Sequence, residues 1–453
     1  MNNLQLLSNI FKTLNDFGLD YCVQNNYQSM PQEIPSDIDI FYRNATEKDL
    51  DTLISNIALL CDLKVVQKTT MGYWGFVYML NKVTPEIGFQ LQLDFQREFS
   101  PPNFPNIYDG DSFLNNKQKF KSFFIPQPSD EIKFTLIRRI IKKDFDQIRL
   151  DYICQLYDSA PDDCNYKLLE IFPKKIYELV LQMINNKDIA IFNSNKKTFY
   201  NYVNSESKAN ATFSKKIKQL KFNVKYQFSS RIINPMGLTI AFISPDGGGK
   251  STIIEAITST CKGCFHGIEN IYFRPRFFKN LGSYKPINPQ GEASSNPDPH
   301  AVKPNGILKS FARYFFYNLD FLLGYFFRIY PLKIKRRLVI FDRYYYDYYV
   351  DLKRYQFNLP KFLPRLFSFM IPQPDLVFVL DAPADVIYSR KQELSITEIE
   401  RQRTIFKKTA KQLKNTHLIN TNQPINEVIN KVTKIIIEKK VKQTAKKIRI
   451  ESN

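Results

Sequence analysis

The stretch LTIAFISPDGGGKSTIIEAITST, residues 238–260, decides the fold of the C-terminal half of this 453-residue chain. It starts with a short apolar run, LTIAFI, typical of a buried strand in a parallel sheet, and it ends with a helical pattern, TIIEAITST. Between them, small residues lead into a lysine and two hydroxyl side chains: Gly247, Gly248, Gly249, Lys250, Ser251 and Thr252. A glycine turn that opens a helix presents main-chain amides and a cation to phosphate, so we expect these residues to bind ATP.

One position of this loop departs from the common pattern. The pattern G-x-x-x-x-G-K-[ST] has a glycine where this chain has Ser244. That position needs mainly a small residue as the chain leaves the strand, and the glycines nearest to the phosphates are present. We therefore expect the serine to be tolerated. The alternative interpretation is a glycine-rich strand-to-helix turn with an incidental lysine.

Apolar segments alternate with helical ones from about residue 235 onward. Four of them have the character of central parallel strands: GLTIAFI, RLVIFD, DLVFVLD and THLIN. The predicted fold class is α/β, with a P-loop NTPase parallel sheet that carries helices on both faces and spans 235–453, basic tail included. Before it we expect a helical connector over 126–230, with a linker at the polar run 204–216, and a small α+β domain over 1–125.

A second motif follows about ninety residues after the loop. The segment LVIFDRYYYDYY, residues 338–349, ends an apolar strand in Asp342 and Arg343. The carboxylate would lie near the Mg²⁺ side of the loop, and the arginine can bind an acceptor phosphate bidentately. With Asp246 just ahead of the glycines, the two segments resemble the thymidylate kinase family of P-loop kinases, which carries x-x-D-G-x-G-K-[ST]-T and then D-R-Y.

The resemblance covers about residues 235–435 and implies roles for the matching side chains. The residues that it makes catalytic are Lys250, Asp342, Arg343 and Arg390. Ser251 and Asp342 would hold Mg²⁺, and Asp246 would approach the sugar of the acceptor. Arg390, in the segment 374–393, would reach over the site from a lid.

The chain departs from the family pattern after the second strand. The family carries R-E-P-G-G-T there, whereas this chain has FRPRF, residues 273–277, and then a Pro- and Asn-rich insertion over 282–305. The expected acceptor is therefore an anionic small molecule whose identity stays open. Arg274 and Arg276 would join Arg343 in an anion clamp, or they would decorate a solvated loop.

The first domain carries a separate cluster of acids. Asp37 and Asp39 stand two apart in IPSDIDIFY, and Asp94 takes a similar place on a later strand. Three such carboxylates could hold Mg²⁺ for nucleotidyl transfer, and the pattern resembles the nucleotidyltransferase fold. The family's glycines ahead of the acids are missing from QNNYQSMPQE, so the acids are either a working metal site or strand-end residues that do not react.

The composition of the chain indicates which kinds of binding partner and which cellular compartment to expect. The formal net charge of +20 favours anionic partners, or it reflects a solvated lysine-rich surface; no motif supports nucleic acid. Six unevenly spaced cysteines and an N-terminus without an export signal predict a cytoplasmic protein. The aromatic segment 311–333 is interrupted by Arg313, Asp320 and Arg328, so we expect contact with a membrane surface at most.

We therefore expect an ATP- and Mg²⁺-dependent phosphotransferase, similar to thymidylate kinase, that acts on an anionic small molecule. Two alternatives stay open. In the first, the N-terminal domain is a nucleotidyltransferase and the loop of the second half senses nucleotide. In the second, the protein is a non-enzymatic scaffold at a membrane surface, bound through its aromatic helix and the basic tail 439–453.

Overall fold

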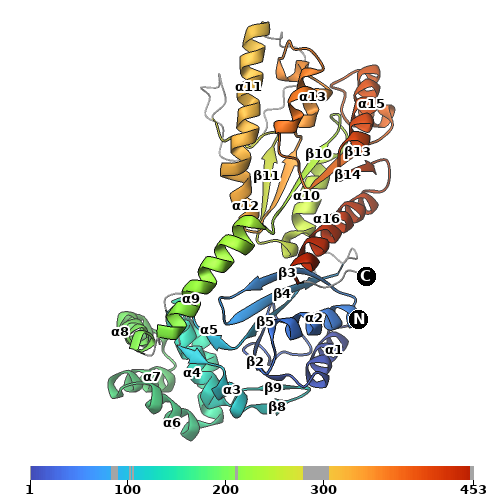
Figure 1. Ribbon diagram of the computed structural model, residues 1–453. Coiled ribbons are helices and arrows are strands. Elements are labelled where there is room, and N and C mark those ends of the chain that lie inside the picture. Colours follow the sequence, from blue (N-terminus) through green and yellow to red (C-terminus); the bar gives the residue numbers. More distant parts are fainter. Residues whose placement is uncertain are drawn as a thin grey trace. The chain divides into compact units, whose positions relative to one another are not determined.

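A computed structural model describes residues 2–82, 90–101, 104, 107–209, 213–278 and 306–448 (Figure 1). The insertion predicted over 282–305 and the end of the basic tail lie outside this part of the chain. The described residues divide into two compact units. Unit 1 contains residues up to 227 and the C-terminal residues from 444, and unit 2 contains residues 228–443. The predicted division into three domains stays a prediction.

Unit 1 contains a five-stranded mixed sheet in the order β1-β2-β5-β4-β3. Only the β2–β5 pair of this sheet is parallel. The strands are β1 (Asp20–Gln24), β2 (Ile38–Arg43), β3 (Lys64–Thr70), β4 (Gly75–Asn81) and β5 (Gln90–Gln96). Two short hairpins join β6 (Glu98–Phe99) with β7 (Tyr108–Asp109) and β8 (Gln118–Phe120) with β9 (Phe123–Ile125). The helices α1 (Asn3–Asp16) and α2 (Glu47–Leu60) are preceded by the N-cap residues Asn2 and Thr46, whose side chains cap their first turns.

Helices make up the rest of unit 1. They are α3 (Asp111–Asn115), α4 (Pro128–Lys142), α5 (Gln147–Ser159), α6 (Pro161–Ile171), α7 (Lys174–Asn186), α8 (Ile189–Ala209) and α9 (Phe213–Lys225), which leads into the π-helix η1 (Tyr226–Ile233). The described parts of the linker predicted over 204–216 are helical, because α8 continues through Ala209 and α9 begins at Phe213. Residues 210–212 lie outside the described part of the chain, so the linker stays a prediction. Phe199, Val203 and Ser207 recur every four residues and are buried, so packing on one face outweighs the polar composition.

Unit 2 contains a five-stranded parallel sheet in the order β11-β12-β10-β13-β14, which fits a P-loop NTPase fold. Its strands are β10 (Leu238–Ile243), β11 (Ile268–Tyr272), β12 (Leu338–Asp342), β13 (Leu376–Asp381) and β14 (Thr416–Asn420). The four strands predicted from apolar runs are confirmed. Successive side chains of a strand point to opposite faces, and both Ile240 and Ala241 are fully buried, so both faces of the sheet are covered.

Most helices of unit 2 lie between these strands in the sequence, and α16 (Ile425–Ile448) follows the last strand and extends into the residues from 444 that belong to unit 1. The others are α10 (Lys250–Thr260), α11 (Ile307–Gly324), α12 (Tyr330–Ile334), α13 (Leu363–Phe367), α14 (Ala384–Arg390) and α15 (Ile396–Gln412), with short turns η2 (Lys262–Cys264), η3 (Tyr325–Ile329), η4 (Tyr345–Tyr349), η5 (Lys353–Tyr355) and η6 (Ser368–Met370). Among the described residues, no helix combines the length and the hydropathy that crossing a bilayer requires.

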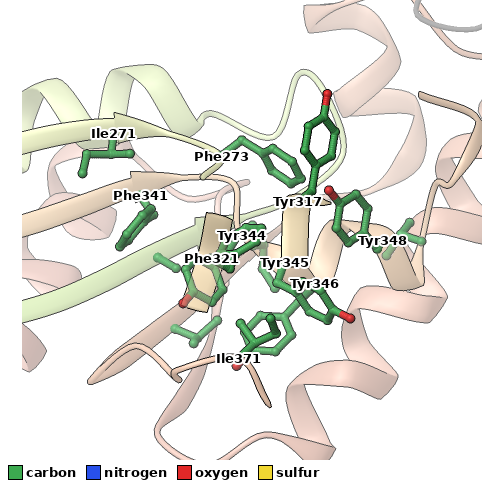
Figure 2. Close-up of a cluster of buried hydrophobic side chains, with 14 of the residues drawn as sticks. Ile271, Phe273, Tyr317, Phe321, Phe341, Tyr344, Tyr345, Tyr346, Tyr348 and Ile371 are labelled. Carbon is green, nitrogen blue, oxygen red and sulfur yellow. The ribbon is translucent and has the colours of Figure 1, made fainter. Parts of the chain in front are cut away.

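An aromatic cluster fixes the chain just after β12. Figure 2 shows the rings of Tyr344 and Tyr345 beside Phe321 of α11. The ring of Phe321 meets that of Tyr345 edge to face, with centroids 5.6 Å apart. Edge-to-face pairs of buried rings add about 1 kcal/mol each beyond their buried area. The cluster therefore holds the backbone that follows Arg343 in one conformation.

Candidate active site

The loop between β10 and α10 has the geometry that its sequence predicts. Gly247 and Gly249 have φ angles of +85° and +91°, a conformation that side chains with a Cβ rarely adopt. Gly248 is required for space, because a Cβ placed on it would lie 2.4 Å from the hydroxyl oxygen of Ser244. The loop ends where α10 begins, at Lys250, so the first amides of this helix have no intrahelical acceptors. These amides and the positive end of the helix dipole can bind an anion.

Ser244 is more than a tolerated substitute for glycine. Its side chain is fully buried, and its hydroxyl accepts a hydrogen bond from Lys250 Nζ at 2.9 Å. The same ammonium also donates to the carbonyl oxygens of Ser244 and Pro245, at 3.0 Å each. Burial and the neighbouring Arg343 lower the pKa of Lys250 to about 8. The lysine is therefore folded back onto the loop and held by three oxygen atoms.

The second predicted motif lies next to this loop. β10 and β12 are parallel neighbours in which Phe242 is in register with Asp342, and the amide of Arg343 donates to Phe242 O at 2.9 Å. The Oδ1 atom of Asp342 is buried and has no hydrogen-bond partner. An unsatisfied carboxylate oxygen is a ligand that Mg²⁺ prefers, so the chemistry of Asp342 fits a magnesium ion. Ser251 is exposed at the start of α10 and offers a hydroxyl oxygen, and its sharing of such an ion stays a prediction.

Asp246 is the centre of a charge network. Its carboxylate accepts hydrogen bonds from the guanidinium groups of Arg343 and Arg354, and Lys250 Nζ lies 3.9 Å away. Arg343 also donates to Asp347 Oδ2 at 2.6 Å. Burial would raise the pKa of Asp246, but Arg343, Lys250 and Arg354 outweigh it and hold this pKa well below its usual range. The carboxylate therefore stays ionised and occupies the space between two arginines.

Sequence reasoning missed Arg354 and Asp347 in this network. Asp347 stands four residues after Arg343 in a segment that is otherwise aromatic. A single acid among aromatic residues could have indicated a charged partner nearby. Arg354 gives no such signal, because the short turns η4 and η5 bring it back to a carboxylate 108 positions earlier in the chain.

The other predicted anion-binding arginines have different partners. Arg274 is buried, donates to Asp320 Oδ2 at 2.8 Å and lies over the ring of Tyr317, 4.1 Å from its centroid. The main-chain amide of Arg276 donates to the same carboxylate oxygen at 3.1 Å, and the Arg276 side chain is exposed. Arg274 and Arg343 are thus neutralised by different carboxylates. Their joint action as a clamp stays a prediction.

Arg390 ends α14, and this helix lies beside the loop. A Cβ placed on Gly247 would lie 2.7 Å from Ile387 O and 3.2 Å from Lys391 Cβ. The guanidinium group of Arg390 is exposed and donates to Thr421 O at 2.9 Å. The segment predicted as a lid is therefore next to the glycines, whereas closure of Arg390 over bound nucleotide stays a prediction.

Unit 1 brings its three predicted acids together. Asp37 precedes β2, and Asp39 of β2 is in register with Asp94 of the parallel neighbour β5. Carboxylate oxygens of the three residues lie within 4.8 Å of one another, a spacing that suits a metal ion. Burial and the neighbouring Asp39 raise the pKa of Asp94 to about 7. Arg138 donates to Asp39 at 3.0 Å, and the side-chain amide of Gln24, in register with Asp39, is buried without a partner.

Comparison with known proteins gives partial likenesses. The sequence matches no family model and no curated protein. A structure of thymidylate kinase from Candida albicans is 17% identical, with a TM-score of 0.33, and the match covers 45% of this chain and 93% of that chain. A thymidylate kinase from Ehrlichia chaffeensis is 20% identical, with a TM-score of 0.30, and the match covers 44% of this chain and 98% of that chain.

Proposed function

We propose that unit 2 is an ATP-dependent phosphotransferase that uses Mg²⁺ and phosphorylates an anionic small molecule. One observation carries this proposal: a glycine loop that opens α10 lies against the ends of two parallel strands, where Asp246, Asp342 and Arg343 meet. Phosphoryl transfer needs little covalent chemistry from the protein, because positioning and neutralisation of charge supply most of the catalysis. A loop of amides, cations and carboxylates supports that chemistry.

Each predicted residue has a proposed task. The ATP phosphates would be held by Gly247, Gly248, Gly249, Lys250, Ser251 and Thr252, and the acceptor by Asp246, Arg274, Arg276 and Arg343. Ser251 and Asp342 would hold Mg²⁺, which would neutralise charge on the ATP phosphates. Lys250, released from its three loop oxygens, would stabilise the charge of the transferred phosphoryl group, and Arg390 would close over it.

The charges around Asp246 indicate how an anionic acceptor would bind. Arg343 and Arg354 present guanidinium groups to one carboxylate. A phosphate or carboxylate of the acceptor offers the same oxygen chemistry and can be bound by the same planar groups. We therefore expect the acceptor to compete with Asp246 for these arginines. Asp246 would then be free to accept a hydrogen bond from an acceptor hydroxyl.

Lys250→Ala tests the proposal. The full-length protein would be incubated with ATP, Mg²⁺ and a panel of nucleoside monophosphates, sugars and sugar phosphates. We expect at least one phosphorylated product, and we expect the variant to reduce its rate by about 100-fold or more, because it removes a cation from the transition state. Lys262→Ala, at an exposed lysine just after the same helix, is the matched control and should react like wild type. Equal rates in all three proteins would contradict the proposal.

A second candidate function belongs to unit 1. The convergence of Asp37, Asp39 and Asp94 within 4.8 Å favours a two-metal nucleotidyl transfer at this sheet. This candidate predicts that label at the α-phosphate of ATP reaches a product. It also predicts that Asp94→Asn abolishes that transfer, whereas Lys250→Ala leaves it unchanged.

A further inference from the structure

The helix α9, which Figure 1 shows in light green, has an unusual charge composition. Its sequence, FSKKIKQLKFNVK, contains five lysines and no acidic residue. The acid-free segment is longer than the helix and extends over residues 207–245. Exposed helices of globular proteins usually carry both acidic and basic residues, which stabilise the helix through ion pairs between side chains three or four positions apart. The composition of α9 therefore favours an anionic binding partner.

The apolar residues of α9 form a stripe on one side. Phe213, Ile217, Leu220 and Val224 follow one another at spacings of four, three and four residues, which places them on the same face of an α-helix. Three of these side chains lie largely in solvent, with exposed fractions of 78% for Phe213, 64% for Leu220 and 58% for Val224. The stripe is thus not explained by packing against the core of unit 1.

Two of the five lysines lie beside this stripe. At 100° per residue, the position of Lys216 is on one flank and that of Lys221 on the other, and both side chains are exposed. The opposite side of the helix is occupied by Phe222, which is partly buried and stacks on Tyr226 with ring centroids 5.2 Å apart. α9 therefore presents a single face, apolar along its middle and basic along both edges.

We propose that α9 binds the surface of an anionic phospholipid bilayer. The stripe of Phe213, Ile217, Leu220 and Val224 inserts at the boundary between headgroups and acyl chains, and the two flanking lysines contact the anionic headgroups. A helix with one apolar face and basic edges, joined to the chain at both ends, can lie flat on such a surface. A second copy of the chain does not fit, because the stripes of two α9 helices would meet with their lysine edges facing each other.

Vesicle sedimentation with the full-length protein tests this assignment. The probes are vesicles of phosphatidylcholine mixed with phosphatidylglycerol and vesicles of phosphatidylcholine alone. We expect binding to the mixed vesicles that weakens as salt is raised, and little binding to the neutral ones. Leu220→Glu should weaken binding by about tenfold or more, since it places a charge in the stripe. Leu59→Glu is the matched control, because Leu59 is an exposed leucine of α2 and the change is the same.

A second pair of variants separates the lysines of α9 from the total charge. Lys216→Glu with Lys221→Glu should weaken binding to the mixed vesicles by about tenfold or more, because each lysine near an anionic surface contributes about a fivefold change. Lys196→Glu with Lys197→Glu, at exposed lysines of α8, changes the net charge equally and should retain binding. No binding of wild type to the mixed vesicles, or equal loss in the α8 and α9 variants, would overturn the proposal. Binding of α9 to an acidic protein but not to these vesicles would overturn it as well.

Discussion

Asp246 is a buried carboxylate between the guanidinium groups of Arg343 and Arg354, with the ammonium of Lys250 close by. Removing one partner of a buried ion pair leaves the charge of the other partner uncompensated. Arg354 contacts the loop through the carboxylate of Asp246 and is not among the residues proposed to hold the ATP phosphates. Its role can therefore be separated from ATP binding.

Replacing Arg354 tests its proposed contact with the acceptor. For an acceptor identified in the panel above, Arg354→Gln should raise the acceptor KM by about tenfold, since one charge-assisted contact is lost, and should leave the ATP KM unchanged. Arg365→Gln, at an exposed arginine that lies over Tyr349, is the control. Steady-state kinetics with each substrate varied in turn make the measurement. An unchanged acceptor KM would contradict the role.

Part of this network could be predicted from sequence. Asp342 and Arg343 stand at the end of an apolar strand. Ligand sites of open parallel sheets lie at the carboxyl ends of the strands, so both residues could be placed near the site. The partnership of Arg354 with Asp246 could not be predicted, because it depends on the path of the turns after β12 and on their aromatic packing. Ser244 was predicted only to be a small residue. The role of its hydroxyl could not be predicted, because nothing in the sequence shows that Lys250 folds back and donates to it.

At the scale of elements, the β10–α10 loop combines tight packing with a buried polar contact. The space that a Cβ on Gly248 would need is occupied by Ser244, whose Cβ and Oγ would lie 2.7 Å and 2.4 Å away. The φ angle of Gly248 is not in the positive range that disfavours alanine. Steric conflict with Ser244, rather than backbone strain, therefore determines the effect of a substitution at Gly248.

Gly248→Ala should lower the free energy of unfolding by about 1–3 kcal/mol, the usual range for overpacking a buried site. The same change in a Ser244→Gly background should be less harmful, because the conflicting side chain is gone, with an interaction energy of about 1 kcal/mol or more between the two positions. Urea unfolding monitored by circular dichroism gives the free energy of unfolding of wild type, of each single variant and of the double variant. Additive effects of the two substitutions would show that Ser244 does not fill this space.

α4 contains a buried acid that makes unit 1 sensitive to pH. Glu131 is fully buried and accepts hydrogen bonds from Tyr27, at 2.8 Å, and from Tyr152. Burial raises the pKa of Glu131 to about 7, against the two tyrosines, which favour its ionised form. The folded state therefore binds this proton more tightly than the unfolded state, so this stabilisation is present at low pH and is lost as pH rises towards 7.

Glu131→Gln should remove this pH dependence. Relative to the variant, wild type should lose about 3 kcal/mol of unfolding free energy between the unfolded pKa and the folded pKa. Trp74, the single tryptophan of the chain, lies buried in unit 1, and its fluorescence reports the unfolding of that unit in urea at each pH. Parallel pH profiles of the two proteins would contradict the assignment of the raised pKa.

The whole molecule combines two compact units, each with its own cluster of charged side chains. The parallel sheet of unit 2 was predictable because central strands are continuous apolar runs. β11 was not among the four runs, since its sequence, IENIY, has partly buried and exposed positions at its start. The helical content of unit 1 around residue 204 was missed for the opposite reason, since its polar residues hide a buried stripe.

The fate of the ATP phosphates tests the central claim most directly. Full-length protein would be given ATP labelled at the γ-phosphate or at the α-phosphate, together with the acceptor panel. We expect the γ-label on the acceptor, its loss in Lys250→Ala and its persistence in Asp94→Asn, because the loop of unit 2 performs the transfer. Transfer of the α-label that requires Asp94 and survives Lys250→Ala, with no γ-label on any acceptor, would contradict the account.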